Sequence, residues 1–182
     1  MSGIVNSLGA RSGVIGATVG MPDGAIIQTS DIFQGTTSTT ADQGNNTWMD
    51  TVVTGTITPT RNTSDILIFS KCHAAMTNTV SDAGYALQFK RQIGSATPTE
   101  PTHLSDHASA NQHSRAYFYK AADDPFNVIR LTDEVIVMDS PATVEELTYT
   151  LQFSTWNMDA LAMVMGGNNS RWQIFFQEIA RK

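Results

Sequence analysis

Apolar and polar residues alternate with a period of two along most of the chain after residue 25. The clearest case is the segment 147–154, where Leu147, Tyr149, Leu151 and Phe153 fall on one side and polar residues fall on the other. The segment 85–93 repeats the pattern. Such alternation is typical of antiparallel strands with one buried face. Both segments therefore predict half-buried strands.

Seven further segments carry weaker strand signals. They cover residues 25–28, 47–58, 65–73, 115–120, 128–138, 160–165 and 171–179, of which 128–138 can hold one or two strands and 160–165 a strand or a short helical turn. We expect loops at 35–46 and 94–114 and a hairpin turn at 166–169. Eight or nine strands without a long helix predict an all-β, antiparallel β-sandwich. A jelly roll fits the strand count, with an immunoglobulin-like sandwich as the alternative.

Residues 1–24 have a different composition from the rest of the chain. Six glycines make a stable helix unfavourable, since each costs about 1 kcal/mol relative to alanine. Large aliphatic residues are nevertheless frequent, which is unusual for a solvated tail. We predict an extended N-terminal arm (1–24) that becomes ordered on contact with a partner, followed by one sandwich domain (25–182). A disordered terminus is the alternative. The attachment candidates are Ile4, Val5, Leu8, Arg11, Val14, Ile15 and Val19.

The last predicted strand is apolar on both faces. Trp172, Ile174 and Phe176 lie on one face, and Phe175 and Ile179 lie on the other. Because a monomeric sandwich needs only one apolar face, the pattern favours a subunit interface or a covering loop. We therefore take Trp172, Phe175 and Phe176 as candidates for an oligomer interface.

The charge balance argues against nucleic-acid binding. The formal net charge is −6, the pI is about 5.0, and the densest basic run is Lys90-Arg91, which we expect on a solvated face. We find neither a secretory signal nor an apolar run approaching the ~18 residues of a membrane helix. The sequence therefore predicts a soluble protein made in the cytosol.

Three histidines form the strongest candidate for metal chemistry. His103, His107 and His113 have the spacing of the metzincin zinc motif, but Leu104 stands where the motif requires a catalytic Glu. The surrounding residues are typical of a loop, whereas ligands four residues apart require a helix. A polar surface loop is thus favoured over a weak metal site.

No other constellation predicts catalysis. Cys72 has only His73 beside it as a base, and neighbouring strand residues point to opposite faces. The carboxylate pairs 123–124, 133–134 and 145–146 are expected at solvated loop edges, with weak Ca²⁺ binding at 123–124 as an alternative. Tryptophans at 48, 156 and 172 can stack on sugars but are more often core residues. We expect no enzymatic activity and no cofactor.

The N-terminal run SGIVNSLGARSGVIG at 2–16 resembles the start of many small virion proteins of cyanophages and other aquatic tailed phages. The body resembles the same group at TITPT (56–60), SDILI (64–68), MDSP (138–141) and EIA (178–180). The loop 94–114 has no counterpart in this resemblance.

The resemblance implies a virion structural protein made in the host cytoplasm, with an N-terminal attachment element and a trimeric β-sandwich. Such proteins are described as capsid decoration (cement) proteins, head fibres or tail-fibre-like proteins. We expect a capsid cement protein that binds the major capsid protein or another virion protein, because the chain has no shaft repeats. The alternative is a tail appendage that binds host glycans.

Overall fold

The computed structural model describes residues 22–36, 38–41, 48–77, 83–101, 116–120, 128–156, 163–166 and 171–181. All regular elements in these ranges are β-strands. The attachment candidates between Ile4 and Val19 lie outside the described residues. The strands are β1 (Ile26–Thr29), β2 (Phe33–Gly35), β3 (Ser38–Ala41), β4 (Met49–Ile57), β5 (Asp65–Thr77), β6 (Ala83–Ile93), β7 (Ala116–Lys120), β8 (Val128–Asp139), β9 (Leu147–Trp156), β10 (Met163–Gly166) and β11 (Trp172–Ile179).

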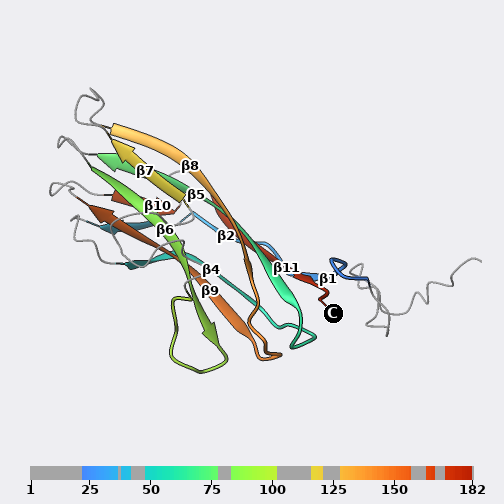
Figure 1. The fold of residues 1–182 in the computed structure, drawn as a ribbon. Coiled ribbons are helices and arrows are strands. Elements are labelled where there is room, and N and C mark those ends of the chain that lie inside the picture. Colours follow the sequence, from blue (N-terminus) through green and yellow to red (C-terminus); the bar gives the residue numbers. More distant parts are fainter. Residues whose placement is uncertain are drawn as a thin grey trace, which may run out of the picture.

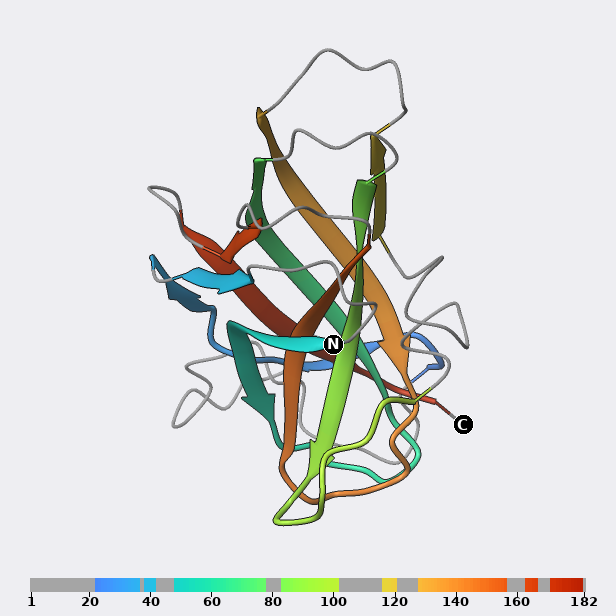
Figure 2. The ribbon, with the colours of Figure 1, turned by 90° about the vertical axis from the view of Figure 1, so that its left-hand side faces the viewer.

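The strands form two antiparallel sheets that pack as two layers (Figures 1 and 2). Sheet A has seven strands: β5 pairs with β8 on one edge and with β10 and β11 on the other, while β1, β2 and β3 form the next row. Sheet B has the order β4-β9-β6-β7. The predicted all-β antiparallel sandwich is therefore confirmed.

The alternating apolar residues face the space between the sheets. Leu147, Tyr149, Leu151 and Phe153 of β9 are all fully buried, and Tyr85, Leu87 and Phe89 of β6 are buried as well. Sheet A contributes Ile66, Ile68, Val135, Val137, Ile174 and Phe176 to the same core. Burial of this apolar surface supplies the main driving force for packing the two sheets together.

Two local predictions were wrong, and one alternative that the sequence left open is resolved. The predicted loop 35–46 contains β3, whose residues Ser38–Ala41 are rich in β-branched threonine. The segment 128–138 is one long strand rather than two. The hairpin predicted around 166–169 does not join paired strands, because β10 and β11 run in the same direction along the same edge of β5.

The chain enters the sandwich beside its own C-terminal strand (Figure 1). Ala25 donates to the carbonyl of Pro22 in a turn that places Gly24 at φ +82°, where glycine is favoured. Backbone bonds then join Gly24 and Ala25 to Ala180. Residues 22–25 are thus fixed to the end of β11, which defines where the preceding segment leaves the sandwich.

A buried carboxylate reinforces this end of the molecule. Glu178 on β11 is fully buried and accepts bonds from the backbone nitrogens of Thr60 (2.9 Å) and Arg61 (3.2 Å). It also accepts from the Gln28 side-chain amide at 2.7 Å. These bonds fix the β4–β5 connection to β1 and β11.

Candidate functional site

The outward face of sheet A carries an apolar strip across three strands. We define the strip as Leu67 and Phe69 on β5, Ile136 and Met138 on β8, and Phe175 on β11. Ile136 is 58% exposed and Met138 is 49% exposed, whereas Leu67, Phe69 and Phe175 are half-buried. Contiguous apolar surface of this kind on a sheet face is characteristic of interaction sites.

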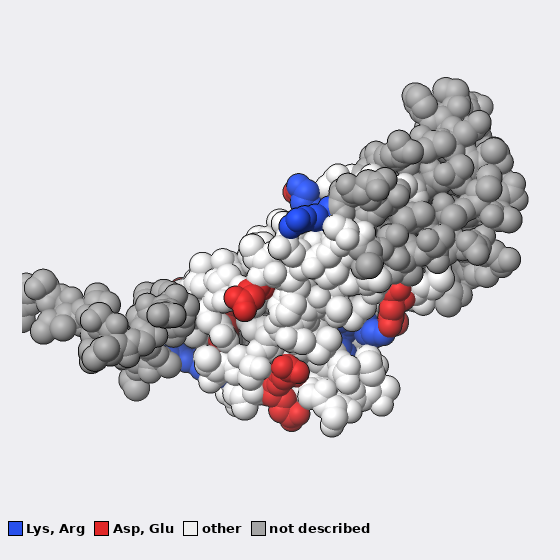
Figure 3. Space-filling view, turned by 180° about the vertical axis from the view of Figure 1, so that it is seen from behind, with Lys and Arg blue, Asp and Glu red and all other residues white. Residues whose placement is uncertain are grey.

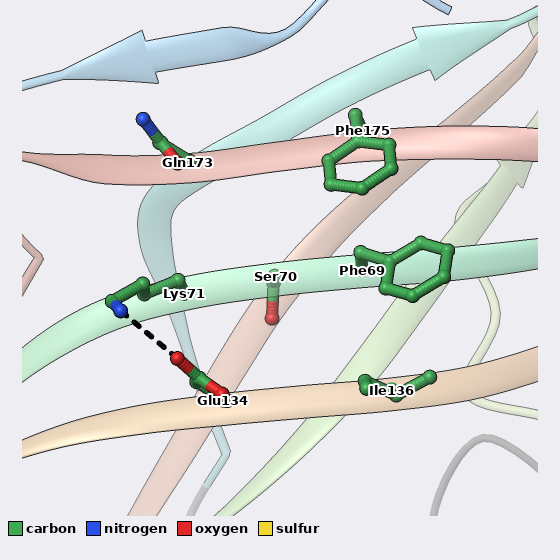
Figure 4. Close-up of a pocket in the computed structure, with 7 residues that line it drawn as sticks. All are labelled: Phe69, Ser70, Lys71, Glu134, Ile136, Gln173 and Phe175. Atoms are coloured by element: carbon green, nitrogen blue, oxygen red, sulfur yellow. Dashed lines mark hydrogen bonds and ion pairs between the residues drawn. The ribbon is translucent and has the colours of Figure 1, made fainter. Parts of the chain in front are cut away.

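The strip is organised by strand register. Phe69 pairs with Ile136 on one side and with Phe175 on the other. The Phe69 and Phe175 rings stack with centroids 4.6 Å apart and an interplanar angle of 6° (Figure 4). Together with the next row of residues they border a shallow hollow of about 170 Å³. The strip therefore presents two flat aromatic rings and an exposed isoleucine to a binding partner.

A polar row follows the apolar row along the same three strands. Lys71 pairs in register with Glu134 on β8 and with Gln173 on β11. The Lys71 ammonium lies 2.9 Å from the Glu134 carboxylate, and both side chains are more than half exposed (Figure 4). An exposed pair of this kind contributes little stability by itself. The ion pair places one positive and one negative charge at the border of the strip.

The outward face of sheet B is different in character. Gln88 donates to Gln152 at 2.8 Å, and Gln152 donates to the Asp50 carboxylate at 2.8 Å. Lys90 forms an ion pair with the same carboxylate. Burial alone would raise the pKa of Asp50, but the hydrogen bonds from Lys90 and Gln152 and the charge of Lys90 lower it overall. Gln88 and Gln152 are only 2% and 4% exposed, so this part of sheet B holds an enclosed network of hydrogen-bonded polar groups, whereas sheet A exposes the apolar strip.

The three predicted interface residues of the last strand separate between the two faces of sheet A. Trp172 is 8% exposed and Phe176 is 0% exposed, because both point into the core between the sheets. Neither side chain is placed to contact a partner on the outer face. Phe175 lies on that outer face, as the alternation within the strand requires.

The remaining residues of the strip do not stand out in the sequence as interface candidates. Leu67 and Phe69 belong to a run in which both alternating sets are apolar, and so do Ile136 and Met138. The two-sided apolar pattern recognised in the last strand was therefore also present in β5 and β8. Which of these residues share a surface depends on strand pairing, which a single sequence does not contain.

Two carboxylates on β8 join the sheets at the sandwich edge. The Asp139 carboxylate is fully buried and accepts two bonds of 2.8 Å from Arg91 of β6 and one of 2.6 Å from the Tyr149 hydroxyl of β9. Near the other end, the Tyr85 hydroxyl donates to Asp133 at 2.6 Å. We expected the side chains of Arg91 and Asp133 to be solvated. This prediction was wrong, because both side chains point between the sheets.

The buried groups with shifted pKa values serve structure. Burial, supported by the nearby Asp133 charge, raises the pKa of the Cys72 thiol to about 12, which keeps it protonated and unreactive near neutral pH. Burial and the neighbouring carboxylates raise the pKa values of Tyr85 and Tyr149. Protonated hydroxyls at these positions are hydrogen-bond donors, as the contacts to Asp133 and Asp139 require.

The candidate metal ligands His103, His107 and His113 lie outside the described residues. Within the described ranges, no group of three or more His, Cys, Asp or Glu side chains is arranged to hold a metal ion. The same part of the chain contains no helix with the length and hydrophobicity needed to span a membrane. On the face seen in Figure 3, the coloured charged side chains are scattered rather than gathered in one region.

Comparison with known proteins does not assign the chain to a family. No protein-family model matches the chain, and no curated protein sequence matches it either. The function of the chain is therefore inferred from the sandwich, the strip and the sequence of the N-terminal segment.

Proposed function

We propose that the chain is a non-enzymatic structural protein of a bacteriophage particle. In this proposal it is a capsid cement or decoration protein that binds the assembled shell through its N-terminal arm. The major capsid protein, or another virion protein, is the partner. Three copies of the chain associate, as the sequence resemblance implies, and the protein resides in the virion.

The observation that carries this proposal is the anchoring of residues 22–25. The apolar segment before them is joined to β11 through the Gly24 and Ala25 bonds to Ala180, next to the buried Glu178. A segment that binds a large particle must transmit load to a folded domain through such a fixed point. Within the described residues, the core is assembled from Ile27 onward, which is consistent with an arm that is available for a partner.

The strand order supports the jelly-roll prediction. β10 and β11 follow one another along the same side of β5 and can be counted as one interrupted strand. In the same way, β1, β2 and β3 pair with the far side of β11 and β10 and can be counted as another. Sheet A then has four positions facing the four strands of sheet B. Successive positions alternate between the sheets except at β6 and β7, which favours a jelly roll over an immunoglobulin-like order.

The chemistry of the described groups is consistent with a binding protein. The half-buried carboxylate of Asp133 and the buried carboxylates of Asp139 and Glu178 all accept hydrogen bonds from the protein itself. The thiol of Cys72 is buried and protonated. A structural protein uses such groups to fix its strands.

The decisive experiment measures binding to purified capsids of the parent phage from which accessory proteins have been stripped. Full-length protein is compared with a variant lacking residues 1–21, which retains the turn at 22–25. A third variant keeps the arm length but carries Ile4→Ser, Leu8→Ser and Val14→Ser.

We expect saturable binding at several hundred copies per capsid for the full chain, because a cement covers the whole shell. Both altered arms should abolish it, since the apolar side chains supply the contact. If the full chain does not bind capsids, the cement function is wrong. Tail attachment, with binding of host glycans, would then be tested on a glycan array.

A further inference from the structure

We propose that a polar hollow at the end of the sandwich binds a carboxylate group, which in the particle is an acidic side chain of the shell protein. The hollow has a volume of about 310 Å³ and lies between the β4–β5 connection, the β8–β9 connection and the end of the chain. Its lining residues are Asn62, Thr63, Ser64, Ser140, Ala142 and Arg181. The assignment of the carboxylate to the shell rests on the proposed function, whereas carboxylate binding itself does not.

Arg181 supplies the positive charge that a ligand meets in the hollow. Its side chain is 61% exposed, whereas the Asp65 side chain beside it is 16% exposed. Nη1 of Arg181 lies 3.3 Å from both Asp65 Oδ1 and Ser140 Oγ. Within the described residues, Nε and Nη2 of Arg181 form no hydrogen bond. These two nitrogens form the edge of the guanidinium that can bind a carboxylate through two parallel hydrogen bonds.

Ser64 supplies a second donor from the buried side of the hollow. The residue is 2% exposed, and in the described part of the chain its hydroxyl has no hydrogen-bond partner. Such a hydroxyl is unfavourable in the free protein, because it has left water without gaining another partner. A carboxylate oxygen in the hollow would accept a hydrogen bond from it. Ser64 therefore favours the bound state over the free one.

The balance of donors and acceptors favours an anionic ligand over a neutral one. Arg181, Ser64 and the exposed amide of Asn62 all offer donors to the hollow. The carboxylate that contacts the lining, Asp65, already accepts a bond of 2.6 Å from Ser140 and the contact from Arg181. A ligand rich in hydroxyl groups needs free acceptors as well as donors, whereas a carboxylate needs only donors.

The position of the hollow points to the shell as the source of the carboxylate. Arg181 follows Ala180, whose backbone binds Gly24 and Ala25 where the arm leaves the sandwich. The two connections that border the hollow lie at the same end of the sandwich as the C-terminus (Figure 1). A protein surface bound by the arm next to residue 22 therefore lies close to Arg181, and an acidic side chain on that surface can enter the hollow.

Carboxylate binding is tested on the full-length protein without capsids. Acetate is titrated into isotope-labelled protein, and the amide signals of Ser64 and Ser140 and the Nε–H signal of Arg181 are followed by NMR. We expect saturable shifts of all three signals. Arg181→Gln should abolish the amide shifts. Arg171→Gln is the matched control and should leave them unchanged, because Arg171 is also exposed but precedes β11, at the opposite end of that strand.

Three further ligands define the chemical class. Acetamide has the shape of acetate without its charge and should cause no saturable shift, and sulfate should bind more weakly than acetate. Methyl glucoside should not bind. The inference is wrong if acetate causes no saturable shift, if Arg171→Gln abolishes the shifts as Arg181→Gln does, or if any of the three other ligands binds as tightly as acetate.

Ser64→Ala provides a readout that distinguishes a binding group from a structural one. Removal of a buried hydroxyl without a partner should raise the unfolding temperature of the free protein. The same substitution should weaken acetate binding at least about threefold, because the ligand loses one donor. A lower unfolding temperature, or unchanged acetate binding, would contradict the role of Ser64 in the hollow.

Binding to stripped capsids tests the source of the carboxylate. Arg181→Gln keeps the whole arm but should weaken capsid binding at least about tenfold, whereas Arg171→Gln should have no effect. Equal affinities of the two variants would overturn the shell as the source. If the unaltered chain does not bind capsids at all, the cement function and the shell as the source both fail. The acetate titration still decides whether the hollow binds a carboxylate.

Discussion

At the scale of single residues, the edge of the sandwich depends on hydrogen bonds to buried carboxylates. Asp139 is fully buried, and a charge removed from water is tolerated only when it is paired and hydrogen-bonded. Arg91 and Tyr149 meet this requirement from the opposite sheet. Burial of the Asp139 charge therefore depends on hydrogen bonds from both Arg91 and Tyr149.

Substitution of Tyr149 tests this interdependence. Tyr149→Phe removes the 2.6 Å hydrogen bond to Asp139 and leaves the ring in place. We expect a loss of roughly 1–3 kcal/mol in the free energy of unfolding, because a buried carboxylate loses one of its donors. Urea denaturation measures the loss. An unchanged value would show that Asp139 does not need the Tyr149 hydroxyl.

Asp133 predicts a dependence of stability on pH. Its pKa is raised by burial, which outweighs the opposing hydrogen bond from Tyr85 and the charge of His73. A carboxyl group whose pKa is higher in the folded state stabilises the protein below its unfolded pKa of about 3.9. That contribution is lost as the pH rises through the folded pKa.

Asp133→Asn removes this titration. We therefore expect the free energy of unfolding of the variant, relative to the unaltered protein, to increase between pH 4 and pH 7. Urea denaturation at several pH values within this interval measures the difference. A difference that stays constant or decreases with pH would contradict the role assigned to burial of Asp133.

At the scale of elements, the close approach of β2 to β4 depends on a glycine, Gly55. A Cβ atom added to Gly55 of β4 would lie 2.6 Å from the Phe33 ring of β2 and 3.0 Å from the Phe176 ring. The Phe33 and Phe176 rings contact each other at a centroid distance of 6.2 Å. Glycine is therefore required at position 55, because the two rings occupy the volume that a side chain would need.

The variant Gly55→Ala should consequently destabilise the protein by roughly 1–3 kcal/mol, the usual cost of overpacking a core. Thermal unfolding followed by circular dichroism measures the change. The double variant Gly55→Ala with Phe33→Leu should recover part of the loss, since the smaller side chain leaves room for the methyl group. Equal stabilities of the single variant and the unaltered protein would refute the steric argument.

At the scale of the whole molecule, the fold is closed by its last strand. β11 pairs with β5 on one edge and with both β1 and β2 on the other. These pairings join residues separated by more than a hundred positions in the sequence, and such nonlocal contacts are costly to form. Within the described part of the chain, β1 and β2 pair only with β11.

Two truncations test this dependence. A chain that ends at residue 170 should show no cooperative unfolding transition, because it loses three strand pairings and the buried Ile174 and Phe176. A chain that lacks residues 1–21 should keep its transition within a few degrees of the full-length value. A large loss of stability in the second variant would show that the N-terminal segment belongs to the folded domain.

The sequence alone determined the fold class and most strands, because a period of two reports directly which side chains are buried. It also identified the two-sided apolar pattern of the last strand. It did not find β3, since the threonines of that strand read as a polar loop without knowledge of β10 as a partner.

Which apolar residues share a surface depends on how the strands pair in three dimensions. Phe69, Ile136 and Phe175 are far apart in sequence and become neighbours through the register of β8, β5 and β11. Packing of the two sheets places Arg91 of β6 beside Asp139 of β8 and buries Trp172 and Phe176. Alternation tells the two faces of a strand apart, but strand pairing determines which face meets the core and which residues complete the surface.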